Sequence, residues 1–187
     1  MLGSHNSLTY LKSNNLLKSW AKCQEVNFEE QYNLGVRCFD VRIKFEKGQP
    51  KIVHNNVDYK GGKEVLDSLY TFMNEKKDCY LRLLLDVRKK PKDTDTLVSA
   101  FKQYILYIQT QFPNIKWAEA ITYWDWNRLV ANKELSIYEV HASVVGEIGI
   151  TKKPKDYAKK YNAYNRNYFK DVLENDNMVL LIDFVNI

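Results

Sequence analysis

The arrangement of the chain is clearest in one segment, Phe28-Glu29-Glu30-Gln31-Tyr32-Asn33-Leu34-Gly35-Val36-Arg37-Cys38-Phe39-Asp40-Val41-Arg42. Its first part has apolar side chains at helical spacing, and Gly35 is typical of the position that follows a helix. From Val36 onward apolar and charged residues alternate, which predicts a strand. Asp40 and Arg42 are two positions apart and therefore project from the same face of that strand.

Helices and strands are predicted to alternate through the rest of the chain. Helices are expected at 28–34, 63–76, 94–112, 125–131 and 156–173, and strands at 36–45, 51–54, 79–87, 118–123, 135–141 and 178–184. This alternation favours an α/β fold, with a parallel sheet and helices packed outside it.

Polar residues of interest fall where the predicted strands end. In chain order they are His5 and Asn6, which follow the short apolar start Met1-Leu2, and then Asp40, Arg42, His54, Asp86, Arg88 and Asp183. Side chains gathered at the carboxyl ends of several strands are typical of a TIM (β/α)8 barrel. The chain has only 187 residues, against about 250 in a typical barrel. We therefore expect a compact barrel that is distorted or truncated.

Length and composition are those of a globular chain. With 45% hydrophobic and 27% charged residues, it can bury a sizeable core, and we expect a single domain over 1–187. A run of about 18 apolar residues is absent, so no transmembrane segment is expected. No signal peptide is visible, which predicts a cytoplasmic or peripheral membrane location, or a secreted one if the start is that of a processed fragment.

The chain is basic, with a net charge of +5. Part of the positive charge is clustered at Arg88-Lys89-Lys90-Pro91-Lys92 and at Lys152-Lys153-Pro154-Lys155, where the prolines predict loops. A basic surface favours anionic partners such as phosphodiesters, acidic lipid headgroups or nucleic acid. For either cluster alone, a solvated loop is the simpler interpretation.

Histidine, arginine and aspartate together form the minimum set for moving a phosphoryl group. His5 and His54 can act as base and acid near neutral pH, and Arg42 can offset developing negative charge. Taken singly, His5 could be a loop histidine, and Asp40 with Arg42 could be a buried or rim ion pair. Only their joint occurrence points to chemistry.

Packing roles are expected for the other residues that could carry chemistry. His141 lies in a strand-like stretch and is interpreted as a core or rim histidine. The tyrosines within 157–168 and the aromatic group within 117–126 are expected to pack in the core, although the second group could line a pocket or a lipid-facing rim. The cysteines match no metal motif and are expected to be reduced, structural thiols; they are Cys23, Cys38 and Cys79.

Taken in order, several segments resemble the X region of phosphatidylinositol-specific phospholipase C and its relatives in the PLC-like phosphodiesterase superfamily. They are Gly3-Ser4-His5-Asn6-Ser7-Leu8-Thr9-Tyr10, the segment 30–42, His54 after its short strand, Leu83-Leu84-Leu85-Asp86-Val87-Arg88-Lys89 and Val179-Leu180-Leu181-Ile182-Asp183-Phe184. The resemblance is strong over 1–90, weak over 113–176, and returns at the C-terminus. It implies a phosphoric diester hydrolase or phosphorus–oxygen lyase on a barrel.

The resemblance also implies catalytic roles. His5 would be the general base on a substrate hydroxyl, which attacks phosphorus and forms a cyclic phosphodiester, and His54 would protonate the leaving oxygen. Arg42 would offset charge on the phosphoryl oxygens. Asp183 would fix the tautomer of His5, and Asp40 would orient Arg42 or His54.

Substrate contacts are expected from Asn6, Asp86 and Arg88. In the calcium-dependent branch of the family, oxygen ligands would stand at positions of this kind, and Asn6 and Asp40 would suit two of them. Arg42 and Arg88 occupy other expected ligand positions, where a cation repels Ca²⁺ and can replace its charge. We therefore expect no metal and no cofactor, as in the bacterial branch, although Asn6 departs from the aspartate common there.

Three hypotheses remain open at this stage. The first is cleavage of a phosphatidylinositol-like headgroup, with phosphoinositide at a membrane surface as the partner. The second is a related enzyme that acts on a soluble phosphodiester or a nucleotide. The third is a catalytically silent module that binds anionic lipid or nucleic acid, against which the complete set of His5, His54, Arg42 and Asp183 argues.

Overall fold

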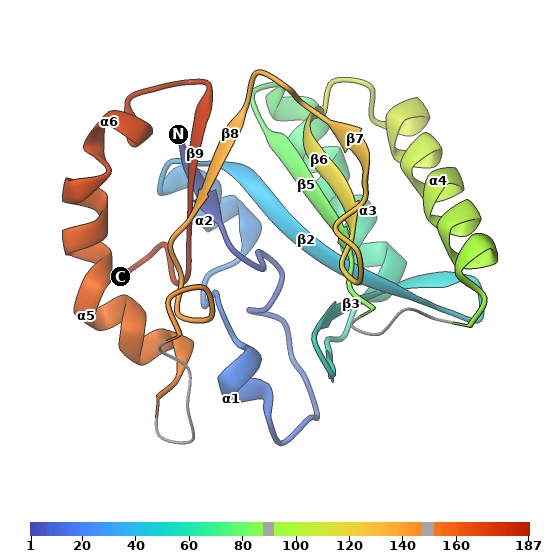
Figure 1. Ribbon diagram of the computed structural model, residues 1–187, viewed down its shortest axis with the longest axis horizontal. Helices are drawn as coiled ribbons and strands as arrows, with labels where there is room; N and C mark the ends of the chain where they lie inside the picture. The colour runs from blue at the N-terminus through green and yellow to red at the C-terminus, as the bar shows by residue number, and fades with distance from the viewer. Residues whose placement is uncertain (88–91, 147–151) are drawn as a thin grey trace.

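The computed structural model of the protein describes residues 1–87, 92–146 and 152–187 (Figure 1). Its elements in chain order are β1 (Leu2–Ser4), α1 (Lys18–Ala21), α2 (Phe28–Asn33), β2 (Val36–Glu46), β3 (Gln49–His54), β4 (Val57–Asp58), α3 (Gly62–Lys76), β5 (Tyr80–Leu85), α4 (Thr94–Gln111), β6 (Lys116–Thr122), β7 (Arg128–Ala131), β8 (Ser136–Glu139), α5 (Pro154–Tyr168), α6 (Lys170–Leu173) and β9 (Met178–Ile182). None of the helices in these ranges is both long and apolar enough to cross a bilayer.

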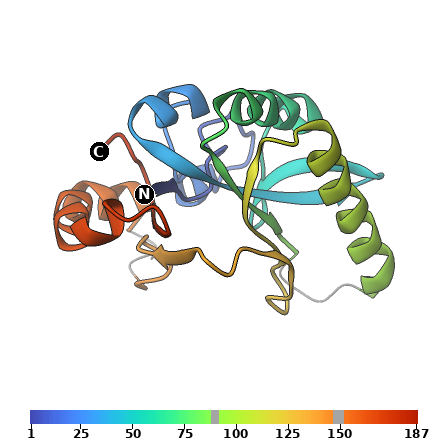
Figure 2. The same ribbon diagram turned by 90° about the horizontal axis from the view of Figure 1, so that it is seen from above.

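The strands form one sheet whose main path is β7-β6-β5-β2-β1-β9-β8. From β6 to β8 every neighbouring pair on this path is parallel, and β7 is added antiparallel to β6. Strands β3 and β4 extend antiparallel from β2 as a side ribbon. The path curls until β7 and β8, its two ends, lie on the same side of the molecule (Figure 2). No ladder joins β7 to β8 in the part of the chain described, so the barrel is open, and the expected truncated α/β barrel is confirmed.

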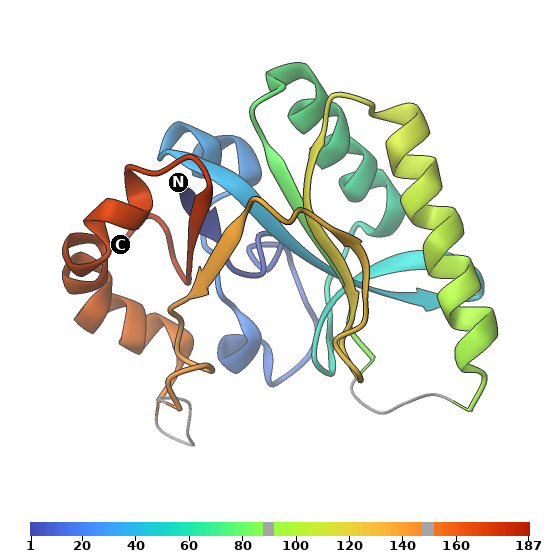
Figure 3. The same cartoon turned by 45° about the horizontal axis from the view of Figure 1, so that its top comes forward.

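Helices cover the outside of the curled sheet, as the alternating pattern predicts. In Figure 3, α3 and α4 lie beside β5 and β6, and α5 and α6 flank β9 at the other end. The apolar stripes of α3 and α4 are buried in one cluster with the strand residues, including Leu69, Tyr70 and Phe101 from the helices and Leu83 from β5. Burial of this apolar surface holds the strand ends in fixed positions around the site.

Gly3 lets β1 fit closely between its two parallel neighbours. A Cβ added at this position would lie 2.7 Å from Cγ1 of Val179 on β9 and 3.4 Å from Cβ of Cys38 on β2. Any larger residue would push these strands apart. The close fit fixes the direction in which the chain leaves β1, and therefore the position of His5.

The helix predicted at 125–131 is wrong. Strand β7 occupies the second half of this range and pairs with β6. Between the two strands, Oγ1 of Thr122 donates a hydrogen bond to the carboxylate of Asp125, and Trp126 adopts a left-handed φ of 54°. A side chain that bonds locally in this way favours a tight turn over a helix.

Other differences concern short elements and boundaries. The helix predicted at 156–173 begins at Pro154 and divides at Phe169 into α5 and α6. Elements α1 and β4 were not predicted, because four and two residues are too few to produce a periodic pattern.

Candidate active site

Four strands bring the predicted catalytic residues together. His5 follows β1, Asp40 and Arg42 lie in β2, His54 ends β3, and Asp183 follows β9. All five side chains are buried, with none more than 7% exposed. Residues from both ends of the chain thus meet at the carboxyl edge of the parallel strands, the usual place for a site in this architecture.

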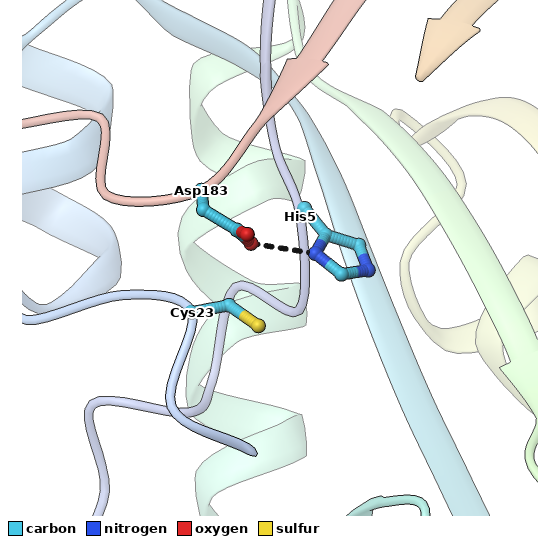
Figure 4. Close-up of side chains that lie close together, drawn as sticks. All are labelled: His5, Cys23 and Asp183. Atoms are coloured by element: carbon cyan, nitrogen blue, oxygen red, sulfur yellow. Dashed lines mark hydrogen bonds and ion pairs between the residues drawn. The ribbon is translucent and has the colours of Figure 1, made fainter. Parts of the chain in front are cut away.

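His5 is held by partners on both ring nitrogens. Its Nδ1 lies 2.7 Å from Oδ1 of Asp183, as Figure 4 shows. Its Nε2 lies 2.9 Å from Nδ2 of Asn6 and 2.9 Å from Nη2 of Arg42, both of which can only donate. The neutral ring therefore carries its proton on Nδ1 and offers the lone pair of Nε2 to the site, which is the form a general base requires.

The surroundings of His5 favour its neutral form. Burial, reinforced by the neighbouring His141 and Arg42, lowers the pKa of His5 well below its ordinary value. The same surroundings make the ring a weaker base, so the proposed proton transfer needs a change in them when substrate binds.

His54 faces His5 edge-on, with ring centroids 5.8 Å apart. Its Nδ1 donates to the carbonyl oxygen of Ala21 at 2.7 Å, which leaves Nε2 as the acceptor of the neutral ring. Burial and the charge of Arg42 lower the pKa of His54 to about 3. His54 can therefore act as an acid only after something in the site favours its protonated form.

Asp40 positions the backbone and the cation beside His5. Its Oδ2 accepts a hydrogen bond from the amide of Asn6 at 2.9 Å and lies 3.6 Å from Nε of Arg42. Burial acts to raise the pKa of Asp40, but the guanidiniums of Arg42 and Arg82 outweigh it and hold that pKa below its ordinary value. Asp40 is thus a buried carboxylate in ion pairs with Arg42 and Arg82.

Arg82 forms ion pairs with three carboxylates beneath the site. The sequence did not predict this role. From β5 it reaches Asp40 at 3.3 Å, Glu119 on β6 at 2.7 Å and Glu139 on β8 at 2.5 Å. Its side chain is 2% exposed, so the ion pairs with these carboxylates offset the loss of hydration of the buried guanidinium. A single arginine inside an apolar strand gives no pattern from which three spatial partners could be inferred.

Replacing Arg82 by methionine is expected to cost about 3–5 kcal/mol of unfolding free energy, because carboxylates would remain buried without their counterion. The measurement is urea denaturation at neutral pH. Arg128→Met is the matched control: Arg128 also binds Glu119, at 2.9 Å, but is 66% exposed, so its loss should cost no more than about 1 kcal/mol. Equal losses in the two variants would contradict the role given to Arg82.

His141 lies in the site beside His5. The prediction that it is a core or rim histidine omits this contact. Its ring stacks on His5 with centroids 3.6 Å apart and planes 5° from parallel. Its Nε2 lies 3.0 Å from Oε2 of Glu139, and its Nδ1 lies 2.8 Å from Oγ of Ser143. The sequence offers only a weak indication of this position, because His141, like His54, is a histidine at the end of a predicted strand.

Three of these side chains, Arg42, His54 and His141, line a cavity of about 180 Å³, and His5 lies behind them without lining it. It is lined by Arg42, His54, Asn55, Tyr123, Trp126, Glu139, His141, Ser143 and Val144. Tyr123 and Trp126 therefore line the pocket, the alternative that the sequence left open for this aromatic group. A cavity with one arginine, two histidines and aromatic walls suits a small anionic group.

The residues expected to contact substrate have different positions. Asn6 lies beneath the site and donates to His5. Oδ2 of Asp86 accepts from the backbone amide of Asn55 at 2.9 Å, so Asp86 holds the chain that follows His54 and does not line the cavity. Arg88 lies outside the described residues.

Comparison of the sequence with family models finds no match, and comparison with curated proteins finds none either. Solved structures do match. A phosphatidylinositol-specific phospholipase C from Listeria monocytogenes aligns over 98% of this chain and 87% of its own, with 14% identity and a TM-score of 0.67. One structure of the Staphylococcus aureus phosphatidylinositol-specific phospholipase C aligns over 98% of this chain and 85% of its own, with 13% identity and a TM-score of 0.63. A second structure of that enzyme aligns over 96% of this chain and 70% of its own, with 20% identity and a TM-score of 0.54.

Similarity at this level of identity establishes the fold. The chain shares the fold of these solved phospholipase C structures, which is the barrel-type α/β architecture expected from its sequence. Function has to be inferred from the site itself, because one barrel fold supports many chemistries.

Proposed function

We propose that the chain is a phosphodiesterase that cleaves a phosphatidylinositol-like phosphodiester at a membrane surface, with His5 as base and His54 as acid. The observation that carries this proposal is the bonding of His5. Asp183 holds its Nδ1 at 2.7 Å, and Arg42, an anion-binding side chain, lies 2.9 Å from its Nε2. The base and the phosphate-binding group are therefore adjacent.

Substrate binding prepares the base. When no phosphate is bound, Arg42 donates a hydrogen bond to Nε2 of His5. This bond uses the lone pair that His5 needs as a base and a donor that Arg42 needs for phosphate. A phosphodiester is a stronger acceptor for a guanidinium than a neutral imidazole is, and it would draw Arg42 away. The substrate hydroxyl replaces Arg42, and also the amide of Asn6, as the partner of Nε2, and Nε2 then takes the proton of this hydroxyl, which lies beside phosphorus. That oxygen attacks, and a cyclic phosphodiester forms as the leaving oxygen departs.

The same event prepares the acid. Arg42 is one cause of the low pKa of His54. A phosphate that neutralises Arg42 and adds negative charge raises that pKa, so His54 takes up a proton on Nε2. Nδ1 keeps its bond to Ala21, and the proton on Nε2 passes to the leaving oxygen. In this proposal Arg42 supplies the cation and no metal takes part.

The test is a substrate panel assayed in EDTA: vesicles containing phosphatidylinositol, soluble glycerophosphoinositol, and linear and cyclic nucleotides. We expect turnover of the inositol substrates, with a cyclic phosphodiester visible by phosphorus NMR, and none in His5→Ala. Turnover abolished by EDTA would contradict the metal-free mechanism, and turnover retained in His5→Ala would contradict the base. Cleavage of nucleotides alone would replace the lipid substrate by a soluble one. No turnover of any substrate would favour a silent binding module.

A further inference from the structure

Three side chains with metal-binding atoms converge beneath the catalytic cavity. They are His5 after β1, Cys23 in the loop after α1, and Asp183 after β9, and they point toward one another in Figure 4. Nδ1 of His5, Sγ of Cys23 and a carboxylate oxygen of Asp183 all lie within 4.8 Å of one another. Each residue is 1% exposed, so these atoms face one another and not solvent.

Cys23 differs from the other two cysteines in its surroundings. Its Sγ lies 3.7 Å from Nδ2 of Asn6 and 3.7 Å from Nδ1 of His54. Cys38 and Cys79, in contrast, are buried in the apolar clusters, as structural thiols are. The thiol of Cys23 instead lies among polar groups: it donates to the carbonyl oxygen of Ala21 at 3.6 Å and is hydrogen-bonded to Asp183.

The backbone fixes Cys23 in this place independently of its thiol. Its amide donates to Oγ1 of Thr9 at 2.9 Å, and its carbonyl accepts from the amide of Phe184 at 2.6 Å. The second bond joins Cys23 to the residue that follows Asp183. Two of the three ligand-bearing segments are thus held side by side by main-chain bonds, as in a preformed site.

The donor set selects the ion. Thiolate, imidazole and carboxylate together suit Zn²⁺, whereas Ca²⁺ and Mg²⁺ require oxygen ligands. Zinc–ligand bonds of about 2.0–2.3 Å place the ligand atoms of a tetrahedral site roughly 3.3–3.7 Å apart. The present separations, 2.7 Å between His5 and Asp183 and up to 4.8 Å within the set, lie on either side of that range.

A fourth ligand atom is available beside the set. Oδ1 of Asn6 is buried with no hydrogen-bond partner among the described residues. A half-turn of this side-chain amide exchanges Oδ1 with Nδ2, which lies 3.7 Å from Sγ of Cys23 and 2.9 Å from Nε2 of His5, so the turned amide no longer donates to His5. An unpartnered buried oxygen is costly, and a metal ion would satisfy it.

We propose that His5, Cys23 and Asp183 bind Zn²⁺ and that the bound ion inhibits the reaction proposed above. Cys23 releases its thiol proton to solvent as the sulfur–zinc bond forms. Zinc takes the lone pair of Nδ1 of His5, so the ring proton moves from Nδ1 to Nε2, where the turned amide oxygen of Asn6 accepts its hydrogen bond and Arg42 moves aside. His5 then cannot accept a proton from substrate. With one thiolate and one carboxylate the zinc set is formally neutral, and Arg42 does not repel it as it would repel a bare cation.

Binding can be tested without substrate. Co²⁺, a spectroscopic substitute for Zn²⁺, is added to the EDTA-treated and desalted protein, and the thiolate-to-cobalt charge-transfer band is recorded. We expect the band in wild type and in the matched controls Cys38→Ala and Cys79→Ala, and its loss in Cys23→Ala. Cys23→Ser, which keeps a polar side chain, is the second variant should the alanine fail to fold. A band retained in a folded Cys23 variant, or absent from wild type, overturns the proposal.

Inhibition is the second measurement and rests on the proposed function, whereas binding does not. Losing a direct ligand should weaken Zn²⁺ binding at least about tenfold in competition with a chromophoric chelator. We expect the zinc concentration that halves turnover to rise by the same factor in Cys23→Ala. Turnover that zinc leaves unchanged while the cobalt band is present overturns the inhibitory role. A band without any turnover refutes the phosphodiesterase proposal alone.

Discussion

A His54→Ala variant is expected to lose about 10²–10⁴ of kcat on a substrate with an alkoxide leaving group. It should lose far less on the corresponding nitrophenyl ester, because a nitrophenolate departs without being protonated. The reason lies in the bonding of His54: Nδ1 is engaged with Ala21, and only Nε2 can pass a proton to the leaving oxygen. The measurement is kcat for both substrates in EDTA.

His5→Ala is the matched control, since it removes the other imidazole of the edge-on pair. It should lose a similar factor on both substrates, because the attacking hydroxyl needs a base whatever group departs. Thermal melting confirms that each variant is folded. If the nitrophenyl ester rescues His5→Ala and not His54→Ala, the two roles are reversed. Rescue of neither variant would remove His54 from the acid role.

Arg42→Lys should lower kcat by about 10²–10³, equivalent to roughly 2.7–4 kcal/mol of transition-state stabilisation. Lysine keeps the charge but not the planar fork that can contact two phosphoryl oxygens at once. Because charge on those oxygens grows in the transition state, the loss should appear in kcat more than in KM.

Arg37→Lys provides the comparison for this substitution. Arg37 also lies in β2 and binds Asp78 at 2.9 Å, but it lies away from the cavity and is about one-third exposed. Its kcat and KM should equal those of wild type. A change confined to KM in Arg42→Lys would mean that Arg42 binds substrate without stabilising the transition state.

The elements that the sequence predicted well are those with long, regular patterns. Helices α3 and α4 and strands β2, β5 and β9 are found within a few residues of the expected limits, because their apolar faces are long enough to show a period. Strand β7 was taken for a helix, since the turn that precedes it is made by a side-chain bond from Thr122 to Asp125. A single side-chain bond of this kind produces no periodic pattern of apolar residues in the sequence.

The site residues that lie in recognisable sequence motifs could be predicted. Those that belong to the site only through contacts in the folded structure could not. His5, Asp40, Arg42 and His54 fall in recognisable segments near the start of the chain, and Asp183 in a comparable one near its end. The contacts of Cys23, Arg82 and His141 join segments that lie far apart in the sequence, and the sheet decides which of them meet. No local pattern encodes such meetings.

The missing ladder between β7 and β8 affects how the site can admit a ligand. A closed barrel holds every strand by main-chain bonds on two sides, whereas β8 pairs with β9 as its only strand partner within residues 1–87, 92–146 and 152–187. On its other side, a side-chain contact from Glu139 to Arg82 crosses the barrel interior. Outward movement of β8 would widen the 180 Å³ cavity and would separate Glu139 from Arg82, while the pairing of β8 with β9 could remain. His141, two residues beyond Glu139, would move with it. The width of the entrance and the stacking on His5 would then change together.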